Sequence, residues 1–139
     1  MATGNNYKQV FNKLMAQVAA DPLFLTYFTS PKSLSPQYTP DPSPVDTSYY
    51  PVAMFSYKTS AKATTFAIET GTIYVIIKTK DYSSIEDIAD FIEGSLHMFR
   101  YSDADLTIYR CFAVEGRTSP VAGQNNTWET LVSFEVQFG

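Results

Sequence analysis

The chain has 139 residues, 45% of them hydrophobic, and its ten Lys and Arg against fourteen Asp and Glu give a formal net charge of -4. This length fits one domain that buries about two-thirds of its unfolded surface, so neither a metal nor a disulfide is required for stability. The scattered basic residues exclude a large electrostatic footprint for nucleic acid, and the longest apolar run, residues 73–77, is too short to cross a membrane.

Cysteine content and the start of the chain indicate the compartment. Cys111 is the single cysteine, so no internal disulfide can form, and no signal peptide opens the chain. We therefore expect synthesis in a reducing intracellular compartment.

An amphipathic helix is predicted near the N-terminus, because apolar residues recur there at helical spacing. The stripe consists of Tyr7, Val10, Phe11, Leu14 and Val18, and we expect it to lie on a sheet. The helix should end near Asp21 and Pro22. Residues 23–27 are apolar but few, and they fit either one more helical turn or an extended piece.

Residues 31–51 contain six prolines in 21 positions, which blocks helix propagation and the donation of backbone hydrogen bonds to a strand. We predict an extended, irregular arm or surface loop here. Loops of this length in a small domain are usually functional or disordered. Tyr38, Tyr49 and Tyr50 give this arm aromatic side chains with which to anchor on a partner.

Two strands are predicted after the arm. The first covers residues 52–58, and a polar connection over residues 58–63 leads to a second strand that begins near Thr65. Gly71 predicts a bend or bulge in the second strand. Residues 73–77 are β-branched or aromatic at every position, which is typical of an interior strand covered on both faces.

A second amphipathic helix is predicted to begin at Ser83 or Ser84, because Ser83 and Glu86 form a capping-box pattern. Its apolar stripe should pack on the sheet and consists of Ile85, Ile88, Ala89, Ile92, Leu96 and Phe99. The opposite arc is typical of a solvated acidic surface and holds Glu86, Asp87, Asp90, Glu93 and His97. Phe91 and Met98 lie off the stripe, so the first helix, the proline-rich arm or a neighbouring subunit is expected to cover them.

Residues 105–114 alternate in polarity and predict a strand. One face is predicted to carry Leu106, Ile108, Phe112 and Val114, and the other Thr107, Tyr109, Cys111 and Ala113. Arg110 interrupts the first set, so we expect it either to have a carboxylate partner or to mark a strand end at an edge or an interface. After a predicted loop over residues 116–126, a half-exposed antiparallel strand should turn one set of side chains inward, namely Trp128, Val132, Phe134, Val136 and Phe138.

These elements follow one another in the order α-β-β-α-β-β. We therefore predict a mixed α/β (α+β) fold in which residues 1–139 form a single domain. It should contain a mostly antiparallel sheet with two helices packed on it, and the long proline-rich arm of residues 31–51.

The sequence predicts no catalytic, cofactor-binding or metal-binding site. His97, the single histidine, falls on the polar arc of the second helix, whereas Cys111 falls mid-strand, so a Cys/His pair is not favoured over a solvated histidine and a small apolar cysteine. The patterns of a P-loop, a dinucleotide site or a zinc site do not occur. Asp103 and Asp105 lack the glycine and final glutamate of an EF-hand loop, and a helix-to-strand turn is predicted there.

Three stretches carry a family resemblance. They are the Tyr74-Val75-Ile76-Ile77 strand, the helix of residues 83–100 after a Lys-Asp-Tyr-Ser turn, and the closing strand of residues 128–138. Together with the N-terminal helix and the order of elements, they make the chain resemble the tail-terminator and tail-completion proteins of tailed bacteriophages. The likeness covers most of the chain outside the proline-rich arm.

The resemblance implies a ring-forming structural protein, usually a hexamer, that caps the completed tail tube and joins it to the head connector. DNA would pass through the opening without sequence-specific binding. The implied location is the tail or neck of a virion made in the host cytoplasm, with no active site, no cofactor and no membrane contact. The proline-rich arm would reach an adjacent subunit, the tube or the sheath.

A ring needs contact surfaces that close on themselves. The expected surfaces are Phe91 and Met98 on the helix flank, Arg110, the arm residues Tyr38, Tyr49 and Tyr50, and a basic connection around Lys58 and Lys62 that meets the acidic arc of the next subunit at Asp87, Asp90 and Glu93. Two other functions stay open. One is another neck or head-to-tail connector protein of the virion, and the other is a small α/β ligand-binding or enzymatic domain with a pocket under the proline-rich loop.

Overall fold

The computed structural model describes residues 4–29, 33–36, 51–59, 69–114, 121–122 and 127–139. In these ranges the chain forms three helices and seven strands, in the order α1 (Gly4–Ala20), α2 (Phe24–Tyr27), β1 (Leu34–Pro36), β2 (Val52–Thr59), β3 (Glu69–Thr79), α3 (Tyr82–Leu96), β4 (Tyr101–Ser102), β5 (Thr107–Ala113), β6 (Val121–Ala122) and β7 (Trp128–Phe138). The predicted order is present as α1, β2, β3, α3, β5 and β7.

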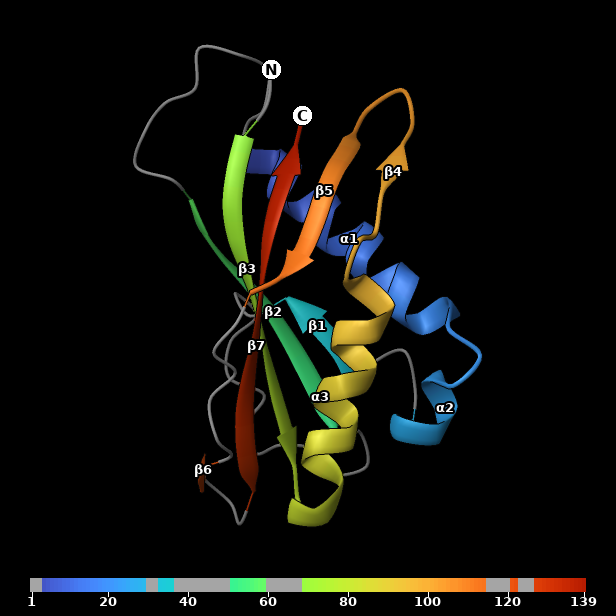
Figure 1. Cartoon of the computed structure of the whole chain (residues 1–139), viewed down its shortest axis with the longest axis vertical. Coiled ribbons are helices and arrows are strands. Elements are labelled where there is room, and N and C mark those ends of the chain that lie inside the picture. The colour runs from blue at the N-terminus through green and yellow to red at the C-terminus, as the bar shows by residue number, and fades with distance from the viewer. Residues whose placement is uncertain (1–3, 30–32, 37–50, 60–68, 115–120, 123–126) are drawn as a thin grey trace.

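All seven strands belong to one sheet, with the strand order β1-β2-β3-β7-β5-β4 and β6 paired to one end of β7. The β1–β2 pair is parallel and the other pairs are antiparallel. Figure 1 shows α1 and α3 together on one side of this sheet. The predicted α+β fold with a mostly antiparallel sheet is confirmed.

The two longest strands, β3 and β7, pair along their whole lengths in the middle of the sheet. Alternate side chains of each strand are buried on the face that carries the helices, for example Val75 and Phe134. On the other face, Tyr74 and Ile76 are only half-buried. The predicted interior position of β3 is therefore confirmed, but its predicted burial is complete on one face only.

Gly71 lies within an unbroken ladder, because it pairs with Thr59 on one side and Val136 on the other without a register shift. The predicted bulge at this glycine is therefore wrong. A Cβ atom at Gly71 would collide with the hydroxyl of Tyr7. The missing side chain at Gly71 therefore makes room for the Tyr7 side chain of α1.

Helix α1 crosses the sheet, from Tyr7 and Phe11 against β2 to Lys13 beside the β4–β5 hairpin, and α2 packs against α1 and α3. The predicted stripe of α1 is buried from Tyr7 to Val18, and its last helical residue, Ala20, confirms the predicted end. The next four-residue segment is a single helical turn, α2, which resolves the alternative left open for residues 23–27. Before this turn, the carboxylate of Asp21 accepts a hydrogen bond of 2.9 Å from the Leu23 amide.

Helix α3 begins at Tyr82, one residue earlier than predicted, because Asp81 and not Ser83 is its N-cap. The Asp81 carboxylate accepts hydrogen bonds from the Ser83 amide at 3.0 Å and from the Ser83 hydroxyl at 2.7 Å. The predicted capping box is therefore wrong. The helix also ends at Leu96 instead of near Arg100, and the predicted apolar stripe is buried from Ile85 to Leu96, whereas Phe99 lies beyond the helix and is partly buried.

A β-bulge between Ile108 and Arg110 changes which face the later residues of β5 occupy. Cys111 therefore lies on the buried face with Ile108, whereas the alternation had predicted opposite faces. Phe112 faces the other side, where it lies opposite Glu135 of β7. The strand itself is confirmed, and the predicted facing is wrong beyond the bulge.

Short strands occupy two segments that had been predicted as irregular. Residues 34–36 of the proline-rich arm form β1, which pairs with β2, and residues 121–122 of the predicted 116–126 loop form β6. Residues 37–50 and the predicted strand start at residues 65–68 lie outside the described residues. Of the helices described, none has the length and hydrophobicity that crossing a membrane requires.

Candidate interaction surface

The two residues suited to nucleophilic chemistry lie in different surroundings. Cys111 is fully buried, and burial raises the pKa of its thiol to about 12, so the thiol stays protonated at neutral pH. His97 is exposed, and its Nδ1 accepts a hydrogen bond of 3.0 Å from the Ala113 amide. The predicted solvated His97 is confirmed, and Cys111 behaves as the small apolar residue that was predicted, although its burial follows from the bulge in β5 and not from the predicted alternation. Within the described ranges, no group of three or more His, Cys, Asp or Glu residues is arranged to hold a metal ion.

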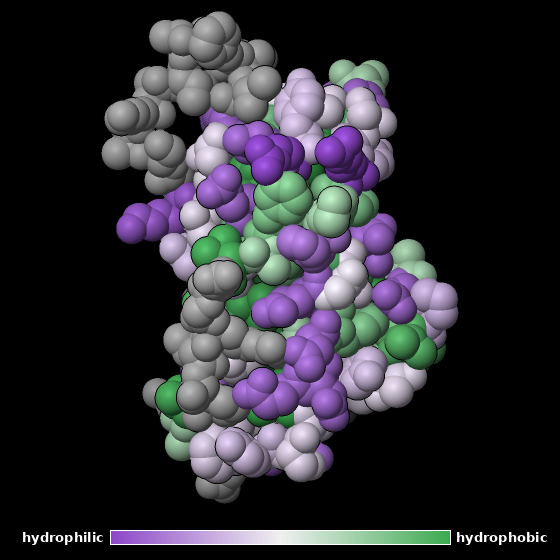
Figure 2. All heavy atoms as spheres, viewed as in Figure 1, coloured by the Kyte–Doolittle hydropathy of each residue, from purple (hydrophilic) through white to green (hydrophobic). Residues whose placement is uncertain are grey.

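The acidic arc predicted on α3 lies at the surface. Glu86, Asp87 and Asp90 are exposed and Glu93 is half-buried, and the helix contains no Lys or Arg. At 1.5 Å per residue, the four carboxylates extend over about 10 Å of the helix. Hydrophilic side chains gather in Figure 2 over the position that α3 occupies in Figure 1. The arc is therefore a stripe of acidic side chains at the surface of α3.

Phe91 is 8% exposed because α2 covers it. Its ring stacks on Tyr27 with the ring centroids 5.0 Å apart, and Phe28 lies at 6.2 Å. The sequence predicted that the first helix, the proline-rich arm or another subunit would cover Phe91. The element that covers it is α2, which lies between the first helix and the arm in the sequence. Little of Phe91 is left for a neighbouring subunit to contact.

Met98 and Arg110, which the sequence singled out separately, come together where the end of α3 meets β5. The Met98 amide donates to the Cys111 carbonyl at 2.6 Å, and the Arg110 guanidinium lies 4.4 Å from the centroid of the Phe112 ring. The centroid of the His97 ring lies 5.6 Å from that of Phe112. Met98 is 64% exposed and Arg110 is also exposed. We call His97, Met98, Arg110, Phe112 and Val114 the β5 edge patch.

The turn at His97 and Met98, which follows α3, covers the outer edge of β5. It does so beyond Thr107 and Ile108, the two residues that pair with β4. Met98 has a φ of 66°, in the left-handed region that non-glycine residues rarely adopt. This conformation accompanies the hydrogen bond from its amide to Cys111, while His97 accepts from Ala113. The turn thus occupies two backbone groups that an added strand would otherwise use.

Sequence reasoning missed Phe112 and Val114 as surface residues of this patch, because the β-bulge reverses the facing of β5. Arg110 itself was the available signal, since a charged residue in an apolar strand position indicates a break in the alternation. Arg110 lies in the middle of β5, beside the edge strand β4, so the predicted strand end is wrong, and its guanidinium lies over the Phe112 ring.

Lys58 lies on the opposite side of the molecule from the β5 edge patch. It is exposed near the end of β2, and β2 and β5 are the second strands from opposite edges of the sheet. Lys62 and the arm residues Tyr38, Tyr49 and Tyr50 lie outside the described residues, so their predicted interface roles stay predictions.

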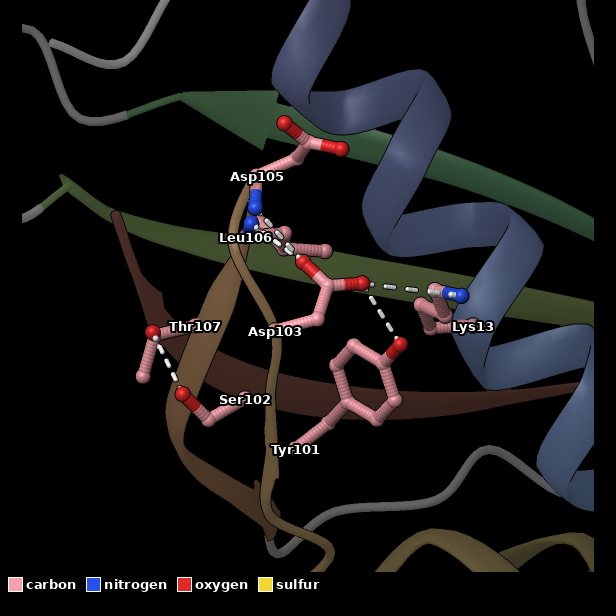
Figure 3. Close-up of polar contacts among 7 residues, drawn as sticks. All are labelled: Lys13, Tyr101, Ser102, Asp103, Asp105, Leu106 and Thr107. Atoms are coloured by element: carbon pink, nitrogen blue, oxygen red, sulfur yellow. Dashed lines mark hydrogen bonds and ion pairs between the residues drawn. The ribbon is translucent and has the colours of Figure 1, made fainter.

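Asp103 holds the hairpin turn between β4 and β5 (Figure 3), which replaces the predicted helix-to-strand turn. One oxygen of its carboxylate accepts from the amides of Asp105 and Leu106 at 2.7 and 2.8 Å. The other oxygen accepts from the Tyr101 hydroxyl at 2.6 Å and lies 3.9 Å from Lys13 Nζ. The Tyr101 hydrogen bond first, and then the two amides, lower the pKa of Asp103. These contacts fix the hairpin to α1 and leave no carboxylate oxygen without a partner.

An open hollow of about 400 Å³ lies between α2 and the start of α3, close to Pro51 at the end of the proline-rich segment. Polar residues such as Thr26, Lys80 and Ser84 contribute to its lining, but the surface exposed in it is more apolar than polar. Sites for small ligands are more often enclosed than this open hollow is. This hollow therefore gives little support to the ligand-binding alternative.

No protein-family model matches the chain, and a search of curated proteins finds no match. Among solved structures, the chain is similar to one chain in the "Virion of native gene transfer agent (GTA) particle". The two structures align with a TM-score of 0.67 over 90% of each chain, and 9% of the residues are identical. At this identity the comparison shows that the two chains share a fold.

Proposed function

We propose that this chain is a structural component of a virion, and more specifically a tail-terminator protein that forms a ring on the end of a phage tail tube and joins it to the head connector. The observation that carries the proposal is the fold shared with a chain of a gene transfer agent virion over 90% of both chains. The resemblance of the strand and helix patterns to tail-terminator proteins supports the finer assignment. The exposed acidic arc of α3 and the β5 edge patch favour contact with other proteins over catalysis.

A closed ring requires each subunit to use two different surfaces, one for the neighbour on each side. This chain has two such surfaces, one on α3 and the neighbouring part of β5 and the other on β2. One consists of the acidic arc of α3 together with the β5 edge patch, and the other carries Lys58 on β2. Their opposite charges suit contact between successive copies, with Asp87, Asp90 and Glu93 facing Lys58 and Lys62.

The first test is the state of assembly of the purified protein. Size-exclusion chromatography with light scattering should give the mass of a closed oligomer, with six copies expected, and negative-stain images should show rings with a central opening. A monodisperse monomer, both alone and in the presence of tail tubes, would contradict the proposal. Rings that bind the head connector but not tail tubes would instead indicate another protein of the neck.

The proline-rich arm has a separate proposed role, which is to reach an adjacent subunit, the tube or the sheath. Because β1 is part of the sheet and Ser33 and Leu34 are buried, a deletion that tests the arm must spare residues 33–36. We expect removal of residues 38–49, with a Gly-Ser bridge of three residues in their place, to weaken ring assembly or tail capping. Unchanged assembly and capping would remove this role.

A further inference from the structure

Gly94 is a glycine in the last turn of α3, and no contact among the described residues requires a glycine there. It lies two residues before the end of the helix and is exposed. A Cβ atom built at Gly94 would meet nothing within 4 Å among the described residues, and the backbone there is helical, so alanine would fit without strain. Glycine lowers helix stability relative to alanine. Gly71 is the opposite case, because there a Cβ atom would collide with Tyr7.

The position of Gly94 on the helix is the outermost one. At about 100° per residue, Gly94 lies about 180° from Ile85 in the buried stripe. Asp90, one turn earlier, and His97, three residues later, lie on the same exposed face. We call Asp87, Asp90, Gly94 and His97 the crest of α3. At Gly94 the missing side chain leaves the helix backbone uncovered, so another chain can approach it closely.

The charge of the crest identifies the kind of partner. Because α3 carries four carboxylates and no basic residue, it repels phosphate groups and attracts a basic protein surface. Lys58 is such a group, and it is exposed on the opposite side of the same molecule. A second copy of the chain can therefore present Lys58 to the crest while keeping its own crest free for a third copy.

We propose that the β2 side of a second copy packs directly on the crest of α3, in contact with the helix backbone at Gly94 and with Lys58 beside Asp87 and Asp90. This contact rests on the ring proposed above. It adds to the charge pairs a closely packed position, Gly94, in the middle of the interface between two copies. The charge pairs then orient the two copies, while the close approach at Gly94 excludes water from between them.

The test compares Gly94→Trp with Ala16→Trp, which places the same bulk on an exposed position of α1. Because there is open space around Gly94, both variants should fold, and circular dichroism with a thermal melt checks this. By sedimentation velocity over a concentration series, we expect Gly94→Trp to weaken self-association about 100-fold and Ala16→Trp less than about 3-fold.

Gly94→Ala gives a second, milder measurement. We expect it to raise the melting temperature of the dissociated chain by about 2–4 °C, because alanine favours helix, and to weaken self-association about 3- to 10-fold, because a methyl group now separates the two copies. A higher melting temperature with unchanged association would overturn the contact.

The remaining outcomes separate this contact from the ring itself. If the wild type forms rings and Gly94→Trp forms them equally well, the ring stands and the contact at Gly94 is overturned. If Gly94→Trp forms rings that no longer cap tail tubes, the crest binds another virion protein and the contact between copies is overturned. A wild-type protein that never self-associates, with or without tail tubes, overturns both.

Discussion

Tyr7 and Gly71 form one packing unit in the core. Tyr7 is 2% exposed, its ring stacks on Tyr57 with the centroids 3.9 Å apart, and its hydroxyl lies against the backbone of β3 at Gly71. That hydroxyl has no hydrogen-bond partner among the described residues. A buried hydroxyl without a partner is unfavourable, so the packing of the aromatic ring must stabilise the arrangement.

Gly71→Ala should therefore lower the free energy of unfolding by about 1–3 kcal/mol, because the new methyl group forces Tyr7 or β3 to move. Urea unfolding measures this change. Tyr7→Phe removes the atom nearest the new methyl group, so the double variant should recover much of the loss. If the changes in unfolding free energy of the two single variants simply add in the double variant, the Tyr7 hydroxyl is not what the new methyl group at position 71 meets.

Stability at high pH should also depend on Tyr7. Burial first, and then the charge of Glu69, raise the pKa of Tyr7 from 10.0 to about 12. The neutral phenol is thus favoured in the folded state, so its contribution is present below pH 10 and is lost as the pH rises towards 12. Between pH 10 and 12 we expect the wild type to lose about 2 kcal/mol more stability than Tyr7→Phe, measured by urea unfolding at each pH. Parallel profiles would contradict this assignment.

Periodicity predicted α1, α3 and β7 well, because each repeats its pattern over at least eleven residues, and a continuous run of β-branched and aromatic residues predicted the middle of β3. The short elements α2, β1, β4 and β6 have two to four residues each, too few to show a period, and tertiary pairing decides them. Proline in β1 is tolerated because this strand lies at the edge of the sheet. The bulge in β5 was missed because one inserted residue reverses all later positions.

Substitutions at the N-terminus of α3 test which residue caps the helix. Asp81→Ala should lower the free energy of unfolding by about 1 kcal/mol, because the Ser83 amide loses its acceptor. Asp81→Asn is the matched control and should stay close to the wild type, since asparagine also caps helices well. Thermal melts compare them with Ser83→Ala. A larger loss for Ser83→Ala than for Asp81→Ala would restore Ser83 as the cap that the sequence pattern predicted.

Across the whole molecule, the candidate surfaces were only partly predictable. The acidic arc follows from helical spacing alone, and Arg110 was singled out by its conflict with the apolar pattern, whereas Met98 was expected to be covered and is exposed in this chain. Their position side by side depends on how α3 meets β5, which no local pattern contains. Gly94 was missed because an isolated glycine in a helix indicates a function only when its surroundings are known to be empty.

The two opposite surfaces give a charge-reversal test. Lys58→Glu should weaken self-association at least about 3-fold at low salt, because it places like charges between neighbouring copies, and Lys62→Glu should act in the same direction. Adding Asp87→Lys to Lys58→Glu should restore association, whereas Asp87→Lys alone should weaken it. Sedimentation velocity at two salt concentrations measures each protein. A double variant that associates no better than Lys58→Glu would count against this pairing.

The place of β7 in the sheet has a consequence for how the protein is made. β7 lies between β3 and β5, yet it follows both of them in the sequence. While the ribosome is still translating residues 128–138, β3 and β5 have no strand between them, and each presents an unpaired edge to other nascent chains. Folding must therefore wait for the insertion of the last strand, and a nonsense codon after Ala122 would leave an aggregation-prone fragment instead of a smaller working domain.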